Sequence, residues 1–226
     1  MFLKKMGIWN LSPNDNDSGM KKKGEQPEEK LGHFEFKTKT LAYDPSKPRN
    51  RPDYLKWLSD EEVVEYLKDR KLNYGILIVN VLYDNNAGNI VRSANAFGAS
   101  EVIIYGHKSF DRRPSVGAEF YSYFRHIKFV EDLTEIFSEY DSVVAIENGE
   151  GAVSLDEFKW DKDKKTLLIF GQESAGIPQE ILDKCHHKVQ ITQFGSVRSL
   201  NVAVAAGIVM YDYCAKTQTL EKYRNN

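Results

Sequence analysis

Short apolar runs alternate with segments of helical periodicity along the chain from about residue 76. Runs typical of strands lie at 76–82, 101–105, 126–130, 143–146, 167–170 and 188–191. Continuous apolar runs of this length are characteristic of strands that are buried on both faces. The succession of strand, helix and strand implies parallel neighbours joined by right-handed crossovers. The pattern therefore predicts an α/β fold with a mostly parallel sheet flanked by helices.

The helices are predicted from apolar residues that recur every three or four positions. Three amphipathic helices are expected, at 54–70, 88–97 and 133–140. Ser59 stands where it would cap the first of them. A fourth helix at 200–214 is different, because it has no charged or hydroxyl side chain from Val202 to Met210. A helix that is apolar on all sides must be covered on all sides, so we expect a central helix or half of a subunit interface.

The first 52 residues differ from the rest of the chain. They are polar, contain few branched apolar residues, and include a basic run at Lys21–Lys23. Because such a segment has little apolar surface to bury, we expect 1–52 to be a mobile extension. A connecting helix at 53–75 and one main domain at 76–226 complete the expected organisation.

Composition narrows the class of protein. The 226 residues carry a formal net charge of -2, so any basic surface must be local. No run reaches the roughly 18 to 20 apolar residues that cross a bilayer, and the first residues are too few for a signal-peptide core. Two cysteines, Cys185 and Cys214, make no disulfide framework, which agrees with a reducing compartment. We therefore expect a cytoplasmic protein without membrane association.

A metal site is not expected. Cys185, His186 and His187 are adjacent in the sequence, so their side chains point in different directions. No second cluster of such residues completes a tetrahedral set.

Small and polar residues gather at the ends of the later apolar runs. Gly-Gln-Glu-Ser-Ala-Gly occupies 171–176 directly after a predicted buried strand, and Ser199 and Asn201 stand where the apolar helix begins. Ligands of α/β proteins bind at the carboxyl ends of parallel strands, and glycine lets the backbone approach a ligand closely. The same residue types are also common as helix caps and turn formers. The local pattern alone leaves both interpretations open.

Three motifs, taken together, resemble those of the TrmH-like (SpoU) family of the SPOUT RNA methyltransferases. The first is Asn86-Ala-Gly-Asn-Ile-Val-Arg92, with a Gly two residues after the Asn and an Arg six residues after it. The segment 171–176 is similar to the second motif, and Ser-Leu-Asn-Val at 199–202 is similar to the third. Each motif is weak alone. Their order and spacing over about residues 77–213 make the resemblance specific.

The resemblance implies two properties that periodicity does not reveal. One is a C-terminal trefoil knot, which patterning would not suggest because knots are rare. The other is S-adenosylmethionine as cofactor, bound in the knot loops largely through backbone groups. The residues implied to bind it are Gly171, Ile191 and Leu200, with Gln193, Gly195, Ile146 and Glu147 as neighbours. Glycine-containing loops suit this role since they can bring main-chain groups to an adenine edge.

The reaction implied by the resemblance is transfer of the sulfonium methyl group to a ribose 2′-hydroxyl of tRNA or rRNA. Arg92 is the residue implied to act at the hydroxyl. Because arginine is very reluctant to deprotonate, holding phosphate or stabilising the developing alkoxide is physically easier than acting as a base. Asn86, Glu173, Ser199 and Asn201 would complete the site by hydrogen bonding. The alternative for Arg92 is a surface arginine in a salt bridge.

The chain departs from the family's pattern at two positions. Asp84 stands where the family often has Pro, and Ala203 where it often has Ser. The change at Asp84 affects the expected rigidity of the loop at the first motif. The change at Ala203 removes one secondary hydrogen bond that the family's Ser could form. The alternative function is a non-catalytic RNA-binding protein that retains the SPOUT fold. The intact set of motif residues argues against it, and nothing in the N-terminal region distinguishes tRNA from rRNA.

Three further expectations concern partners. Arg112 and Arg113, beside Tyr121 and Tyr123, would either hold RNA phosphate and stack on bases or form a solvated loop. The basic extension 1–52 would either be a solvated tail or add to RNA affinity. A homodimer is expected because the apolar helix needs cover and because the family builds active sites across subunits.

Overall fold

The apolar runs form the strands of one sheet. The computed structural model describes residues 50–79, 84–106 and 110–217. The strands in this part of the chain are β1 (Tyr74–Val79), β2 (Val102–Tyr105), β3 (Phe124–Ile127), β4 (Ser142–Ile146), β5 (Val153–Ser154), β6 (Thr166–Phe170) and β7 (His187–Gln190). Neighbouring strands pair in parallel, in the order β3-β2-β1-β6-β4-β7-β5. The predicted mostly parallel sheet is confirmed.

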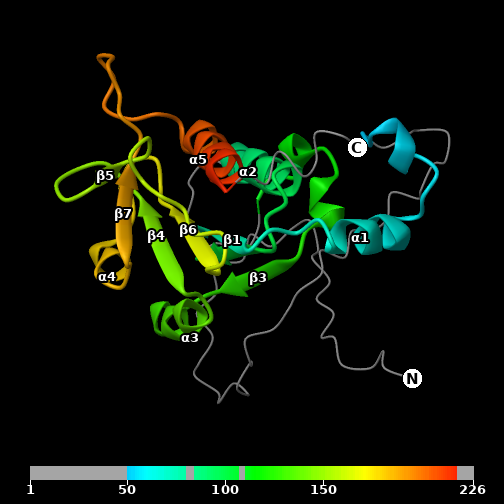
Figure 1. Cartoon of the computed structure of the whole chain (residues 1–226), viewed down its shortest axis with the longest axis horizontal. Coiled ribbons are helices and arrows are strands. Elements are labelled where there is room, and N and C mark those ends of the chain that lie inside the picture. Colours follow the sequence, from blue (N-terminus) through cyan, green and yellow to red (C-terminus); the bar gives the residue numbers. More distant parts are fainter. Residues whose placement is uncertain (1–49, 80–83, 107–109, 218–226) are drawn as a thin grey trace, which may run out of the picture.

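Helices cover both faces of this sheet (Figure 1). The described helices are α1 (Asp60–Lys68), α2 (Asp84–Ala96), α3 (Leu133–Ser138), α4 (Gln179–Leu182) and α5 (Val202–Lys216), with shorter 3-10 turns η1 (Asp53–Leu55), η2 (Arg113–Ser115), η3 (Ala118–Tyr121) and η4 (Val130–Asp132). Helices α2 and α5 pack together on one face, and α3 and α4 lie on the other.

Alternation along the strands builds a separate core on each face. In β1, Ile76 and Ile78 join the core beneath α2 and α5, whereas Leu77 and Val79 join the core beneath α3 and α4. All four side chains are at most 2% exposed. Since both faces of the strand are covered, its sequence is continuously apolar rather than alternating.

The order of the strands locates the region where a ligand can bind. The chain runs outward from β1 through β2 to β3, and β4 is then placed on the other side of β1, with β6 between β1 and β4. Connections therefore leave the sheet in opposite directions on the two sides of β1. In open α/β sheets, the carboxyl ends of the strands beside such a switch form the binding crevice.

Helix α2 and strand β3 differ in their bounds from the sequence-based prediction. Helix α2 begins at Asp84 rather than near Gly88. The polar residues before Gly88 suggest a loop, but they form the first turn of the helix. Gly88 lies inside the helix and packs closely against the loop after β2, since a Cβ atom there would be 2.4 Å from the carbonyl oxygen of Asp111. Strand β3 ends at Ile127 because the chain enters η4 at Val130. Residues 80–83 of the first predicted strand lie outside the described residues.

The start of α1 agrees with the prediction. The Ser59 hydroxyl accepts from the Glu62 backbone N–H at 3.2 Å, and the Glu62 carboxylate accepts from the Ser59 N–H at 2.7 Å. This reciprocal capping box satisfies two backbone donors that the first turn cannot pair internally.

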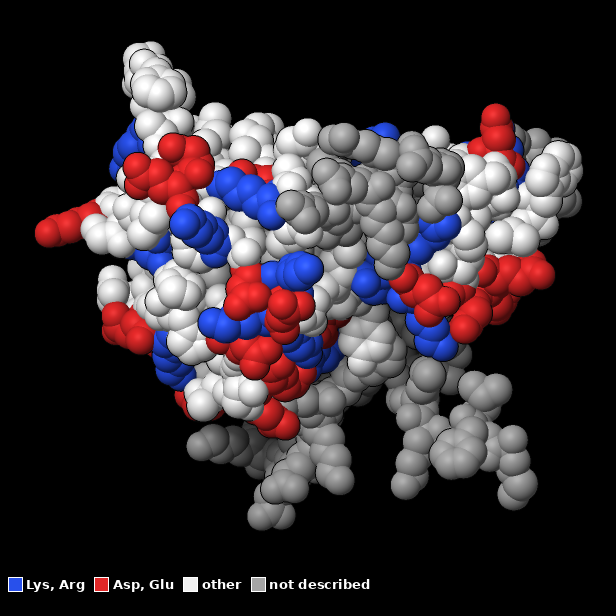
Figure 2. Space-filling view, in the orientation of Figure 1, with Lys and Arg blue, Asp and Glu red and all other residues white. Residues whose placement is uncertain are grey.

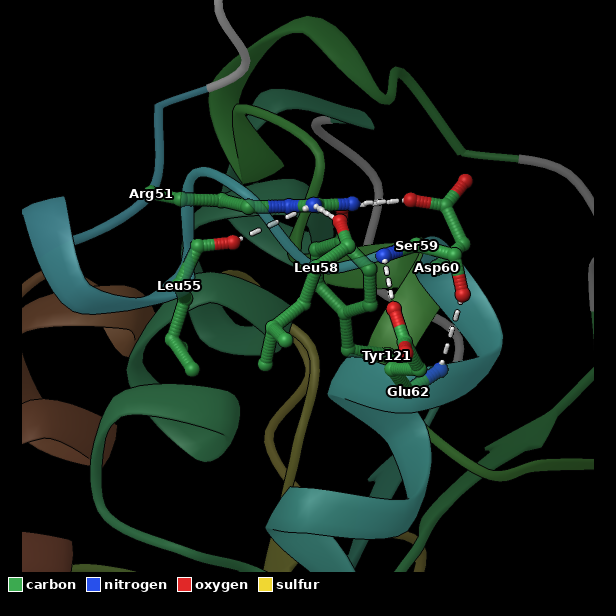
Figure 3. Close-up of polar contacts among 7 residues, drawn as sticks. All are labelled: Arg51, Leu55, Leu58, Ser59, Asp60, Glu62 and Tyr121. Carbon is green, nitrogen blue, oxygen red and sulfur yellow. Dashed lines mark hydrogen bonds and ion pairs between the residues drawn. The ribbon is translucent and has the colours of Figure 1, made fainter.

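Arg51 attaches the chain before α1 to the main domain (Figure 3). Its side chain is 8% exposed and forms an ion pair with Asp60. The guanidinium also donates to the Tyr121 hydroxyl at 2.6 and 2.8 Å and to the Leu58 carbonyl at 2.6 Å. Residues 1–49 of the predicted mobile extension lie outside the described residues, whereas the chain at Arg51 is held against η3.

Among the described residues, helix α5 is covered on one side and exposes apolar side chains on the other. Its residues Ala206, Val209, Met210, Tyr213 and Cys214 are buried. The opposite side leaves three large apolar side chains exposed, which are Val204 (52%), Ile208 (39%) and Tyr211 (54%). The described residues therefore cover this apolar helix only in part.

Candidate functional site

A pocket of about 250 Å³ lies at the carboxyl ends of β4, β6 and β7. It is formed by the ends of these strands, the loop 171–176, the segment 191–200 and the first turns of α5. Among the predicted site residues, those that line the pocket are Ile146, Glu147, Gly171, Glu173, Ile191, Gln193, Ser199 and Leu200. Two of the three sequence motifs thus meet in one cavity, although more than 20 residues separate them.

The loop 171–176 is closed by its own backbone. Gln172 and Gly176 exchange two hydrogen bonds, of 3.0 and 2.8 Å between nitrogen and oxygen. Gly171 lies directly against Gly176, where a Cβ atom on Gly171 would be 2.4 Å from the carbonyl carbon. Gly176 has a φ of +69°, which favours glycine. Both glycines are therefore required by the shape of this pocket wall.

A chain of hydrogen bonds connects all three motifs. The Asn201 side-chain oxygen caps α5 by accepting from the backbone N–H groups of Ala203 (2.9 Å) and Val204 (3.3 Å). Its amide nitrogen therefore faces Asn86, whose oxygen accepts at 3.0 Å. The Asn86 amide nitrogen in turn donates to the Glu173 carboxylate at 2.5 Å. The helix cap thus orients both amides and directs a donor at Glu173.

Asn86 is the most buried of the three residues in this series of hydrogen bonds. It is only 8% exposed, although it belongs to the first turn of α2. A buried amide requires partners for both its oxygen and its nitrogen, and Asn201 and Glu173 supply one each. The structure accordingly brings Asn86, Glu173 and Asn201 together, as the resemblance implies.

Arg92 and Gly195 lie apart from the pocket. Arg92 is exposed on α2, does not line the cavity, and has no hydrogen-bond or ion-pair partner among the described residues. The salt bridge that was the alternative role for Arg92 is therefore not formed within this part of the chain. Gly195 is exposed, and an added Cβ atom would meet no other atom within 4 Å.

Arg198 is a pocket residue that the sequence reasoning did not select. It lines the cavity beside Ser199, is exposed, and its guanidinium has no partner within residues 50–79, 84–106 and 110–217. Its position next to Ser199 in the third motif is the one sequence signal that would have indicated it. Gln172, Ser174, Ala175, Asn148 and Val202 also line the cavity.

The pocket contains a polar atom that lacks a partner. The side-chain oxygen of Gln193 is buried, and it accepts no hydrogen bond from the described residues. Because a buried acceptor without a donor is unfavourable, this atom fits a ligand that carries an N–H or O–H group. The segment 191–200 contains no helix or strand, so ladder bonds do not occupy its backbone. The lining therefore fits a polar cofactor held partly by main-chain groups.

Of the residues after β2 that could bind RNA, Arg113 and Tyr121 already have partners within the chain. Arg113 donates to the Asp111 carboxylate through Nε and Nη2, at 2.6 to 3.0 Å. The Tyr121 hydroxyl and ring are engaged by Arg51, whose guanidinium carbon lies 5.0 Å from the ring centroid. The solvated-loop interpretation is favoured for Arg113, while Arg112 is exposed.

Charged side chains are mixed on the face shown in Figure 2. Lysines and arginines are interspersed with aspartates and glutamates, and acidic side chains gather over α1. This mixture of charges agrees with the formal net charge of -2. A protein with this net charge can have a basic surface only in a limited region.

The described residues show neither a metal-binding cluster nor a membrane-spanning helix. No group of three or more His, Cys, Asp or Glu side chains there is arranged to hold a metal ion. Among the same residues, no helix combines the length and apolar character needed to cross a membrane.

Comparison with known proteins identifies the family. Residues 73–211 match the SpoU rRNA Methylase family, and the chain belongs to that family. A TrmH family tRNA/rRNA methyltransferase of Staphylococcus aureus is 28% identical over 159 residues, which are 67% of this chain and 64% of that protein. The chain thus spans a little under two thirds of the length of this relative.

Solved structures agree with this assignment. The TrmH/SpoU tRNA modifying enzyme of A. aeolicus matches with a TM-score of 0.64 and 25% identity, covering 73% of this chain and 85% of that one. The SpoU methyltransferase AviRb of Streptomyces viridochromogenes, in complex with the cofactor AdoMet, matches with a TM-score of 0.57 and 28% identity. That match covers 65% of this chain and 57% of AviRb.

Proposed function

We propose that this protein is an S-adenosylmethionine-dependent RNA methyltransferase that modifies a ribose 2′-hydroxyl of tRNA or rRNA. The observation that carries the proposal is the hydrogen-bond chain from Asn201 through Asn86 to Glu173 at the rim of one pocket. Membership of the SpoU family and the likeness to AdoMet-bound AviRb support the cofactor. The specificity for the 2′-oxygen and the kind of RNA rest on the resemblance of the three motifs.

The cofactor would occupy the pocket at the ends of β4, β6 and β7. Gly171, Ile191 and Leu200 would offer backbone groups, and the unpaired oxygen of Gln193 would accept from a donor of the cofactor. When bound, S-adenosylmethionine supplies an electrophilic methyl group. The chain itself has to exclude water, align the ribose and manage the proton of its hydroxyl.

Arg92 would act on the RNA rather than on the cofactor. An unpaired guanidinium is suited to hold a phosphate or to stabilise an alkoxide as the hydroxyl loses its proton. Ser199 and Glu173 line the pocket and would hydrogen-bond to the ribose or orient its neighbours. Asn86 already donates to Glu173, which keeps that carboxylate in a defined position.

The proposed enzyme is a homodimer with an active site shared between copies. Arg92 lies outside the pocket of its own chain, and α2 packs against α5, whose outer side exposes Val204, Ile208 and Tyr211. A second copy that covers this surface would bury the apolar side chains and bring Arg92 to its partner's pocket. A two-fold arrangement would do so in both copies at once.

Three finer features belong to the same proposal. The C-terminal part of the chain would be threaded as a trefoil knot, as the resemblance implies. The main domain would run from residue 76, after a connecting segment and a basic extension that adds to RNA affinity. The protein would work in the cytoplasm, where tRNA and rRNA are available as substrates.

The proposal is tested by methyl transfer to RNA. The protein is incubated with methyl-labelled S-adenosylmethionine and total tRNA or rRNA, and the product nucleosides are identified. Label in 2′-O-methylated nucleosides is the expected result, and mapping these positions in RNA from cells with and without the gene would identify the target. RNA binding without any transfer would favour the non-catalytic alternative. Label on a base would disprove ribose specificity.

A further inference from the structure

Glu147 makes contacts that differ from those of a residue that simply faces a cofactor. It follows the last residue of β4 and lines the pocket. One carboxylate oxygen, Oε2, accepts a hydrogen bond from the backbone N–H of Ile177 at 2.9 Å. The other, Oε1, accepts from the N–H of Asn148 at 3.2 Å. The Ile177 contact crosses from the end of β4 to the loop that follows β6.

This contact fills a space that the loop leaves for it. A Cβ atom on Gly176 would lie 2.5 Å from Glu147 Oε2, so glycine at this position makes room for the carboxylate. Gly176 in turn lies against Gly171 at the end of β6. The loop is thus held between two strand ends, with the Gln172–Gly176 backbone pair closing it on one side and Glu147 on the other.

The contact also bears on Glu173. Residues 173–175 are the part of the loop between the Gln172–Gly176 pair, and they form a wall of the pocket. If Ile177 were released, the closing pair at Gln172 and Gly176 would lose its adjacent support. The pocket wall formed by residues 173–175 would then be less rigidly held. The same would apply to the Glu173 carboxylate, which accepts a hydrogen bond from Asn86.

We propose that Glu147 is a positioning residue that shapes the loop 171–176 by accepting a hydrogen bond from Ile177. Its role is to accept a hydrogen bond from the Ile177 N–H. The shape of the loop depends on this hydrogen bond and not on the negative charge of Glu147 or on a direct contact with the cofactor. This inference rests on the proposed function only for the identity of the ligand. The shape of the loop can be measured without any RNA or methyl transfer.

Glu147→Gln and Glu147→Ala separate these roles. Glutamine has no charge but retains a side-chain oxygen that can accept from Ile177, whereas alanine removes the acceptor. Glu150→Ala is the matched control, because Glu150 is an exposed carboxylate three residues further along and does not line the pocket. The readouts are hydrogen exchange of the Ile177 amide and calorimetric titration with S-adenosylmethionine and with S-adenosylhomocysteine, which lacks the sulfonium charge.

We expect Glu147→Ala to accelerate exchange at Ile177 and to weaken binding of both ligands by up to about tenfold, as for loss of one ordinary hydrogen bond. Glu147→Gln should retain most of the protection and affinity, and Glu150→Ala should match the parental protein. Loss in Glu147→Gln for S-adenosylmethionine alone would show that charge is the function, and this would overturn the proposal. Weakened binding in Glu147→Ala with unchanged exchange at Ile177 would overturn it in favour of direct contact.

These outcomes are independent of RNA methylation. A parental protein that binds S-adenosylmethionine but methylates no RNA would contradict the proposed function, while the comparison of the Glu147 variants would still decide the role of this residue. If the parental protein bound neither ligand, exchange at Ile177 in the two variants would still support or refute the hydrogen bond as the constraint on the loop.

Discussion

Gly171 has no room for a side chain, because even a Cβ atom would lie 2.4 Å from the carbonyl carbon of Gly176. Contacts this close with backbone cannot be relieved by a rotamer change, so the loop itself would have to move. We therefore predict that Gly171→Val weakens S-adenosylmethionine binding by at least about tenfold, a loss on the order of 1.4 kcal/mol. Calorimetric titration measures the affinity, and a melting curve checks that the variant remains folded.

Gly195 provides the contrasting substitution. A Cβ atom there would meet nothing within 4 Å, so Gly195→Ala changes little in the chain itself. If affinity for S-adenosylmethionine falls as much in this variant as in Gly171→Val, Gly195 contacts the cofactor directly, as the resemblance implies. An unchanged affinity would remove Gly195 from the set of cofactor-binding residues.

Arg92 is predicted to matter for transfer and not for cofactor binding, because its proposed role is to act on the RNA and its side chain lies outside the pocket of its own chain. Arg92→Ala should reduce single-turnover methylation by about 100- to 1000-fold, the usual effect of removing one preorganised charge at a reacting oxygen. Its affinity for S-adenosylmethionine should stay within a few-fold of the parental value. Arg113→Ala, which removes an exposed arginine that is paired with Asp111, is the control. Parental rates in Arg92→Ala would exclude Arg92 from the mechanism.

At the scale of an element, the start of α5 combines structural support with a site function. Asn201 caps the helix with its oxygen and donates to Asn86 with its nitrogen. Serine caps helices about as well as asparagine but is too short to preserve the second contact. Asn201→Ala should therefore lower stability by about 1 kcal/mol for the lost cap, in addition to the cost of leaving the buried Asn86 oxygen without a donor. Asn201→Ser should recover the contribution of the cap and raise the melting temperature above that of Asn201→Ala.

Methylation should respond differently from stability in these two variants. Both replacements remove the donor to Asn86, so both should reduce methyl transfer to a similar extent. If Asn201→Ser restored transfer as well as stability, Asn201 would act only as a helix cap.

The opposite edge of the sheet carries a buried ionic network that joins β2, β3 and α3. Arg125 donates to Glu101 at 2.6 and 3.0 Å and to Glu139 at 2.6 Å, and the Tyr140 hydroxyl donates to Glu101 at 2.6 Å. The Arg125 and Glu101 side chains are only 12% and 10% exposed. Burial and the adjacent Glu101 carboxylate raise the pKa of Tyr140 well above its usual range, so the hydroxyl remains a donor.

Breaking this network should be costly. Arg125→Met would leave the Glu101 carboxylate buried without its cationic partner, and we predict a loss of about 3 kcal/mol in the free energy of unfolding. Arg113→Met is the control, since Arg113 forms an ion pair with Asp111 but is 89% exposed. Denaturant titration of both variants measures the difference. Equal, small effects would show that Arg125 contributes no more than a surface ion pair.

At the scale of the whole molecule, the uncovered side of α5 predicts self-association. Light scattering should give about twice the chain mass of 25.9 kDa at micromolar concentration. Ile208→Asp, which places a charge in the middle of the exposed apolar side, should shift the protein toward monomer and reduce methylation. Val64→Asp is a matched control, because Val64 on α1 is exposed to a similar extent, 45% against 39%. A stable parental monomer would contradict the dimer.

Much of the architecture follows from local sequence. Strands covered on both faces require unbroken apolar runs, so β1, β4 and β6 were recognisable without knowledge of their neighbours. The cap at Ser59 was recognisable for a similar reason, since its partner Glu62 is three residues away. The order of the three motifs was enough to indicate the family, and residues 73–211 match it.

Tertiary structure decided the features that depend on distant residues. At the polar start of α2, Asn86 pairs with Glu173 and Asn201, which are 87 and 115 residues away in the sequence. The place of β6 between β1 and β4 likewise has no local signal. Local propensity determines which segments become strands and helices. The position of each buried polar group depends on partners that only the packed chain brings within hydrogen-bonding distance.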